Sequence, residues 1–278
     1  MTETQMTETQ AWPHYTPPSR VLVHDLDVAY RRAGSGEPLL YFHGAALTRR
    51  WLPFHDALAT RFDVIAPEHP GFGDTARPAW LADFRDVVLH YRDLLDTLKL
   101  GKVHLVGHGF GGWLAAEFAA VYPERLESLT LIAPSGLRPQ DEDGDVVDIF
   151  RLEPEQAAEA MLGPDAARWS GIFDEGDPIE QAVRAYAELT TEALLSWNPR
   201  YDLKLEQHLP RISVPTRVLV PQHERMLAAS IGRRYAELIP GALLTRVEGD
   251  DVDTEHLLIL QEPQKIADLI HPFNQTGK

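Results

Sequence analysis

The sequence predicts an α/β fold, in which helices cover both faces of a mostly parallel central sheet and a helical cap is inserted. Three observations predict this architecture. Apolar runs that are too short for helices recur along the chain, and segments of helical periodicity separate them. The runs that end near residues 42 and 106 lead directly into glycine-containing turns. The alternation then stops over residues 137–210, where short helical patterns carry many aromatic side chains.

The first two predicted strands, at residues 21–23 and 27–31, form a hairpin. A turn at residues 34–36 comes after the second strand. The next runs are apolar without alternating polar positions, and this pattern is typical of strands that are buried on both faces of a sheet. These runs are Leu39–Phe42, Asp63–Ala66, Val103–Val106, Leu129–Ala133, Arg217–Val220 and Leu243–Val247.

Helical periodicity predicts helices at residues 81–98, 112–121 and 228–238, between the strands. Residues 137–210 open with an acidic loop at 141–145 and continue as short helices, so we interpret them as an inserted cap. The core then comprises residues 19–136 and 211–278. Residues 1–18, which begin with the polar duplication MTETQMTETQ, are expected to form a disordered tail.

Composition excludes several classes of function. The chain has no cysteine, which rules out disulfides, thiolate metal sites and cysteine nucleophiles. Its formal net charge of −16 disfavours nucleic acid and anionic membranes as partners. Neither a signal peptide nor an apolar run of about 18 residues is found, so we expect a cytoplasmic protein that takes a small-molecule substrate or ligand. A homodimer would be compatible with this composition.

No metal or cofactor is expected. The histidines show no ligand spacing, and the acidic cluster at residues 250–255 is interpreted as a solvated loop.

The segment Gly107-His108-Gly109-Phe110-Gly111 lies between a predicted strand and a predicted helix. The same context surrounds the nucleophile elbow G-x-S-x-G, whose serine position is occupied here by Gly109. Together with Gly112, the segment also matches the dinucleotide fingerprint G-x-G-x-x-G. That fingerprint needs an acidic residue about 20 positions later, at the end of the next strand. The next strand ends instead at Ala133-Pro134-Ser135, so the dinucleotide interpretation is disfavoured.

Three further segments agree with the elbow. One predicted strand is followed by Phe42-His43-Gly44-Ala45-Ala46. Another is followed by Pro67-Glu68-His69-Pro70-Gly71-Phe72-Gly73-Asp74-Thr75. Two strands near the C-terminus are followed by Glu224 and by His256. With these motifs the chain resembles the α/β-hydrolase superfamily over nearly its whole length. It is most similar to the capped branch of esterases, epoxide hydrolases and C–C hydrolases.

The resemblance implies a role for each motif. Gly109 stands at the nucleophile position, Glu224 is the acid and His256 the base, in the chain order of this fold. The backbone N–H groups of Phe110 and Ala45, or Ala46, would form an oxyanion hole. The segment 67–75 would be scaffold. The expected substrate-binding residues are His43 and the cap aromatics Trp169, Phe173 and Trp197, and packing of the cap onto the core is the alternative role of these aromatics.

The chain departs from the family pattern at the acid, where Glu224 replaces Asp, and in the histidine loop. There Gln261 replaces an acidic residue, and Glu255 replaces the glycine that precedes the histidine. His108 is adjacent to Gly109, and Ser135 follows the next strand. Neither is at the tip of the turn, which disfavours both as substitute nucleophiles.

Three interpretations of function remain. In the favoured one, His256 acts as a base in non-covalent chemistry on a small apolar ester, lactone or ketone-type substrate. The second is a non-catalytic ligand-binding pseudo-hydrolase. The third is a serine hydrolase whose nucleophile has been replaced by mutation. The sequence alone does not decide whether the protein is an active enzyme.

Overall fold

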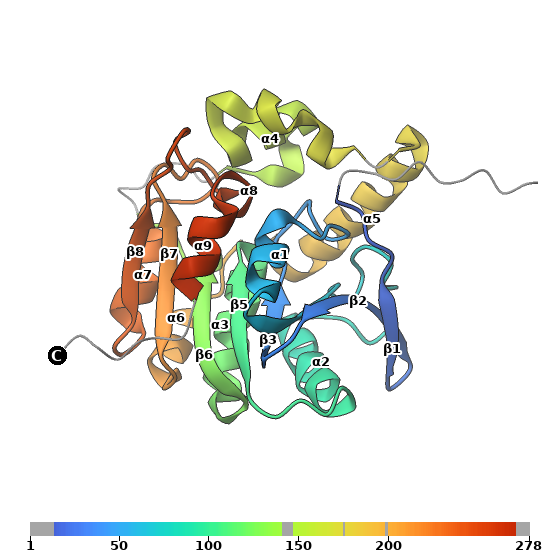
Figure 1. The fold of residues 1–278 in the computed structure, drawn as a ribbon, viewed down its shortest axis with the longest axis vertical. Coiled ribbons are helices and arrows are strands. Elements are labelled where there is room, and N and C mark those ends of the chain that lie inside the picture. Colours follow the sequence, from blue (N-terminus) through green and yellow to red (C-terminus); the bar gives the residue numbers. More distant parts are fainter. Residues whose placement is uncertain (1–13, 141–146, 175, 198–199, 271–278) are drawn as a thin grey trace, which may run out of the picture.

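The computed structural model describes residues 14–140, 147–174, 176–197 and 200–270, and these residues contain an eight-stranded sheet (Figure 1). The strand order is β1-β2-β4-β3-β5-β6-β7-β8. β2 runs antiparallel to β1 and β4, and the other neighbours are parallel, so the mostly parallel sheet is confirmed. The bounds are β1 Ser19–Val23, β2 Leu26–Gly34, β3 Glu37–Phe42, β4 Phe62–Pro67, β5 Val103–His108, β6 Leu126–Ile132, β7 Thr216–Pro221 and β8 Leu243–Val247.

Burial follows the position of each strand in the sheet. Every residue of the central strand β5 is buried, as its continuous apolar run predicts. β8 was predicted to be buried on both faces as well, and that prediction is wrong. It is an edge strand, and Leu243 and Leu244 are 52% and 42% exposed. An apolar run does not distinguish an edge strand from a central one, because strand order depends on long-range pairing.

Helices form a layer on each face of the sheet, as predicted. α2 (Phe84–Thr97), α3 (Phe110–Val121) and α7 (Ser230–Leu238) pack into one hydrophobic cluster. α1 (Pro53–Ala59), α8 (Leu258–Gln261) and α9 (Pro263–Ile270) pack into the other. α1 and α9 were not predicted from the sequence, because each has no more than eight residues and so gives a weak periodic signal. A short 3-10 turn, η1 (Pro123–Arg125), precedes β6.

The segment between β6 and β7 contributes the cap helices, which lie above the carboxyl ends of the strands in Figure 1. They are η3 (Ile149–Arg151), α4 (Pro154–Leu162), η4 (Gly163–Phe173) and α5 (Pro178–Ser196). α5 has 19 residues and is longer than the short helices that we expected. Asp177 caps it by accepting hydrogen bonds from the N–H groups of residues 179 and 180.

The chain returns to the core through α6 (Leu205–His208) and η5 (Leu209–Arg211), whose leucines Leu205 and Leu209 belong to the core cluster. The exact boundaries of the cap at residues 137 and 210 remain a prediction. Most of the predicted N-terminal tail and the acidic loop at 141–145 lie outside the described residues. Among the residues that the structure describes, no helix is long and apolar enough to span a bilayer.

Candidate active site

Gly109 lies at the tip of the turn that joins β5 to α3. Its φ of 56° and ψ of −117° fall where side chains other than hydrogen are strained. Its N–H donates to the carbonyl of Ile132, and its own carbonyl accepts from the N–H of Ser135. The turn is therefore held rigidly against the end of β6. A Cβ at position 109 would lie 3.0 Å from Nε2 of His256 and 3.9 Å from Cα of Gly44. The tip thus faces both the histidine and the loop after β3.

The neighbouring glycines are required by close backbone packing. A Cβ at Gly111 would lie 2.3 Å from the carbonyl oxygens of both Phe42 and His43. A Cβ at Gly107 would lie 2.3 Å from the carbonyl oxygen of Gly111. These contacts bring the start of α3 directly against β3 and β5. Gly107 and Gly111 therefore have a packing role that does not depend on what occupies position 109.

Gly111→Ala should destabilise the fold strongly, because two backbone carbonyls would have to move away from the new methyl group. Overpacking of this kind costs about 1–3 kcal/mol and sometimes more. Thermal or urea unfolding of the variant measures the loss. Gly101→Ala is the matched control, because a Cβ there meets no atom within 4 Å. Equal stability of the two variants would contradict this account of the turn.

His256 and Glu224 lie side by side, although 32 positions separate them in the chain. Nδ1 of His256 is 3.0 Å and 3.2 Å from the two carboxylate oxygens of Glu224. Oε1 of Glu224 also accepts from the N–H groups of Met226 and Leu227, which fixes the carboxylate. A carboxylate at Nδ1 leaves Nε2 as the ring nitrogen without a proton. That nitrogen is the one that faces Gly109.

Thr254 joins the loops that carry the acid and the histidine, and the sequence analysis did not identify it. Its hydroxyl accepts from the N–H of Gln222 and donates to the carbonyl of Val247, and its carbonyl accepts from the N–H of His223. The side chain is completely buried. A single threonine in a loop gives no sequence signal for these contacts, which span up to 32 positions.

Gln261 supports the same loop. Its Oε1 accepts from the N–H of Glu255 at 2.7 Å, and its Nε2 donates to the carbonyl of Asp253. An amide thus holds the backbone just before His256, at the position where the resemblance led us to expect a carboxylate. Glu255 is buried against Gly163 of the cap, and Arg225 neutralises it. The departures from the family pattern in this loop are therefore accommodated by local contacts.

The predicted oxyanion donors, Ala45 and Phe110, lie at the two loops that meet beside Gly109. Within the described residues, no group accepts a hydrogen bond from the backbone N–H of either one. Ala46 has a φ of 74°, which is unusual for alanine, so the loop after β3 is held in a strained shape. Two unpaired N–H groups next to His256 are the arrangement that would stabilise a developing oxyanion.

His43 belongs to the support of this loop. The N–H of His69 donates to Nε2 of His43, whose Nδ1 lies 2.8 Å from the carbonyl of Gly44. His69 in turn contacts the carbonyl of His43 through Nε2 and the hydroxyl of Tyr91 through Nδ1. Burial lowers the pKa of His43 to about 4, so the ring is neutral near pH 7. Both ring nitrogens are engaged inside the protein, and neither is left for a substrate.

His108 also has a structural partner. Its Nε2 donates to the backbone carbonyl of His256 at 2.9 Å, and burial lowers its pKa to about 3. The neutral ring therefore anchors the backbone of His256. Its hydrogen bond and burial do not suit a nucleophile.

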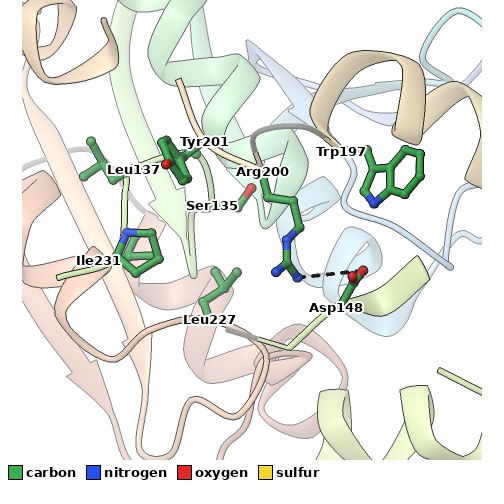
Figure 2. A pocket seen from close by; sticks show the side chains of 10 residues that line it. Ser135, Leu137, Asp148, Trp197, Arg200, Tyr201, Leu227 and Ile231 are labelled. Carbon is green, nitrogen blue, oxygen red and sulfur yellow. Dashed lines mark ion pairs between the residues drawn. The ribbon is translucent and has the colours of Figure 1, made fainter. Parts of the chain in front are cut away.

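A cavity of about 440 Å³ opens beside the turn, between the end of β6 and the cap (Figure 2). It adjoins the site because the N–H of Ser135 donates to the carbonyl of Gly109 and the N–H of Leu227 donates to Glu224. Arg200 and Asp148 form an ion pair of 3.8 Å at its rim. Its lining includes Ser135, Leu137, Asp148, Trp197, Arg200 and Leu227.

Of the three predicted cap aromatics, the structure places Trp197 on this cavity. Trp169 and Phe173 are half-buried and pack against the hydrophobic cluster under α1, α8 and α9. They contribute to packing of the cap, and neither lines the cavity. Within the described residues, no group of three or more His, Asp or Glu side chains is arranged to hold a metal ion.

Comparison with known proteins agrees with this fold. A family model described as "alpha/beta hydrolase fold" matches residues 37–263. An uncharacterized protein of Mycobacterium tuberculosis is 25% identical over 281 residues, which cover 91% of this chain and 80% of that protein. The monoacylglycerol lipase of Homo sapiens is 26% identical over 269 residues, which cover 87% of this chain and 76% of the lipase.

A similar fold also occurs among solved structures. The meta-cleavage product hydrolase from Pseudomonas fluorescens IP01 superposes with a TM-score of 0.74 at 21% identity. The match covers 91% of this chain and 96% of the hydrolase. At this level of identity the likeness concerns the fold.

Proposed function

Because the chain belongs to the α/β-hydrolase fold family, we propose that it hydrolyses a small, largely apolar ester, lactone or ketone-type substrate without a covalent intermediate. His256 is the general base in this proposal, and it acts on a water molecule that attacks the substrate directly. The relatives include a protein named as a monoacylglycerol lipase, which supports hydrolysis as the reaction class.

One observation carries the proposal, namely the orientation of His256 toward Gly109. Nε2 lies 3.0 Å from the position of a Cβ at residue 109, and glycine fills none of the space next to it. A water molecule there can donate to Nε2, and the N–H groups of Ala45 and Phe110 lie on the loops around it. Glu224 stabilises the imidazolium that forms when His256 takes the proton.

The reaction then proceeds by addition of water. As His256 accepts a proton, the water oxygen bonds to the substrate carbonyl carbon, and negative charge develops on the carbonyl oxygen. The N–H groups of Ala45 and Phe110 stabilise that oxygen. Each such donor typically contributes about a hundredfold to a thousandfold in rate. The cavity beside Trp197 and Leu227 has room for the apolar part of a small substrate.

A panel of p-nitrophenyl esters, alkyl esters and lactones tests this function. We expect steady hydrolysis with no initial burst, and intact-protein mass spectrometry during turnover should show no acyl adduct, because position 109 has no hydroxyl to acylate. An acyl adduct on any residue would contradict direct attack by water. If no member of the panel is hydrolysed, the absent nucleophile at Gly109 favours a non-catalytic ligand-binding protein instead.

A further inference from the structure

The cap helix α5 places one face on the loops around the candidate site. Oε1 of Glu188 accepts from the N–H of Gly73 at 2.8 Å, and its Oε2 accepts from the hydroxyl of Thr48 at 3.1 Å. The side chain of Thr191 packs directly against Gly71. Residues 188, 191 and 192 are within one turn of each other, so they share a face of the helix. Glu192 therefore projects from the side of α5 that meets the core.

The side chain of Glu192 is largely buried, and its carboxyl group has no hydrogen-bond partner among the described residues. Its exposed fraction is 8%, and no described residue donates to its carboxyl group. The other buried carboxylates in the described chain are all partnered, Glu68 by Arg31, Glu117 by His208 and Glu255 by Arg225. The fully buried, unpartnered side-chain atoms of the described residues do not include its oxygens, so the carboxyl still reaches accessible space. A largely buried carboxyl without a protein partner calls for an explanation. The free carboxyl is therefore available to a ligand.

Two titratable groups act on Glu192, namely Glu188 on its own helix and His256 across the site. His256 itself contacts the carboxylate of Glu224 through Nδ1 and the neutral ring of His108 through its backbone carbonyl. The pKa of Glu192 is raised to about 7, mainly by burial. The charge of Glu188 also raises this pKa, and His256 lowers it. Near neutral pH a large fraction of Glu192 is therefore an uncharged carboxylic acid that can donate a proton.

We propose that Glu192 is the general acid of the site and that it protonates the leaving oxygen of an alkyl ester or lactone. This inference rests on the proposed function. It divides proton transfer between two groups, with His256 as the base and Glu192, on the cap helix α5, as the acid. The natural substrate is then an ester whose alkoxide is too basic to leave without a proton.

His256 removes one proton from water, and the hydroxyl adds to the carbonyl carbon. When the tetrahedral intermediate collapses, the carbon–oxygen bond to the alcohol breaks, and its electron pair stays on the leaving oxygen. That oxygen takes the proton of Glu192, which yields the acid and the alcohol. Imidazolium on His256 and carboxylate on Glu192 remain, and transfer of one proton through solvent restores both groups.

The dependence of the hydrolysis rate on the leaving group distinguishes acid catalysis by Glu192 from a structural role of this residue. Glu192→Gln keeps the size and a hydrogen-bond donor but cannot transfer a proton. Since p-nitrophenoxide leaves without protonation, its ester should be hydrolysed by the variant within about threefold of wild type. The alkyl ester should slow by roughly a hundredfold or more, the usual size of acid catalysis. The retained p-nitrophenyl ester hydrolysis also demonstrates that the variant is folded.

The pH profile gives a second readout. The protonated form is the active one, so wild-type kcat/KM for the alkyl ester should fall as pH rises through about 7. Glu192→Gln should lack this decline. Glu180→Gln, the same substitution at an exposed position of α5, should leave both the leaving-group ratio and the profile unchanged.

Two failures are distinguishable. If wild type hydrolyses the p-nitrophenyl ester with dependence on His256, but Glu192→Gln slows both esters equally or neither, only the role of Glu192 is overturned. If wild type hydrolyses neither ester, the proposed function is overturned, and the role of Glu192 falls with it.

Discussion

His256→Ala is expected to lower ester hydrolysis by roughly a hundredfold to ten-thousandfold, the usual contribution of a general base. The reason is geometric, because Nε2 of His256 is the basic atom that faces the tip of the turn at Gly109. Initial rates under saturating and limiting substrate separate kcat from KM. Since the base acts in the chemical step, kcat should fall while KM changes little.

His223→Ala is the matched control for this variant. His223 lies on the adjoining loop, and among the described residues its exposed side chain pairs with Asp253 alone, so its loss should leave the rate unchanged. Combining His256→Ala with Glu224→Gln adds a stringent check. If Glu224 acts through His256, the double variant should be no slower than His256→Ala alone. Additive losses would mean that Glu224 acts on the substrate by another route.

The framework of this site could be predicted from the sequence because its signals are local. The runs at 39–42 and 103–106 mark strands, and the glycines at 107 and 111 mark the close packing that the structure contains. The chain order of Gly109, Glu224 and His256 then suggested which loops meet. Each of these inferences needed only a short segment and the rule that parallel strands end at the same edge of a sheet.

The supporting contacts could not be predicted, because they join segments that are distant in the chain. Thr254 reaches Val247 and Gln222, and His69 reaches His43 across 26 positions. Glu192 was not among the predicted site residues, because a glutamate in a helical segment gives no sign of its burial. Only the docking of α5 on the loop at residues 71–73 shows that its carboxyl is buried. Side-chain identity gives the chemistry of a group, and burial, which is a tertiary property, decides its protonation.

Gly109→Ser is expected to convert the site to covalent chemistry at a cost in stability. The backbone at position 109 is in a region where a non-glycine residue costs roughly 1–3 kcal/mol. For a domain of this size, each kcal/mol lowers Tm by about 2–4 °C. The new Cβ would lie 3.0 Å from Nε2 of His256, so the ring must shift by a few tenths of an ångström. The serine hydroxyl would then lie beside the nitrogen that can remove its proton.

An acyl-enzyme should accumulate on that serine, visible as a burst of p-nitrophenol and as an acyl adduct in the intact-protein mass. Gly109→Ala separates the two effects of the substitution. It introduces the same Cβ and the same backbone strain without a hydroxyl, so its Tm should fall equally and no adduct should form. It also fills the space that we assign to the attacking water, so hydrolysis should be lost. Undiminished hydrolysis by Gly109→Ala would mean that the attacking water does not lie next to position 109. A Gly109→Ser variant that forms no adduct would mean that the oxyanion donors at Ala45 and Phe110 are not positioned for acyl transfer.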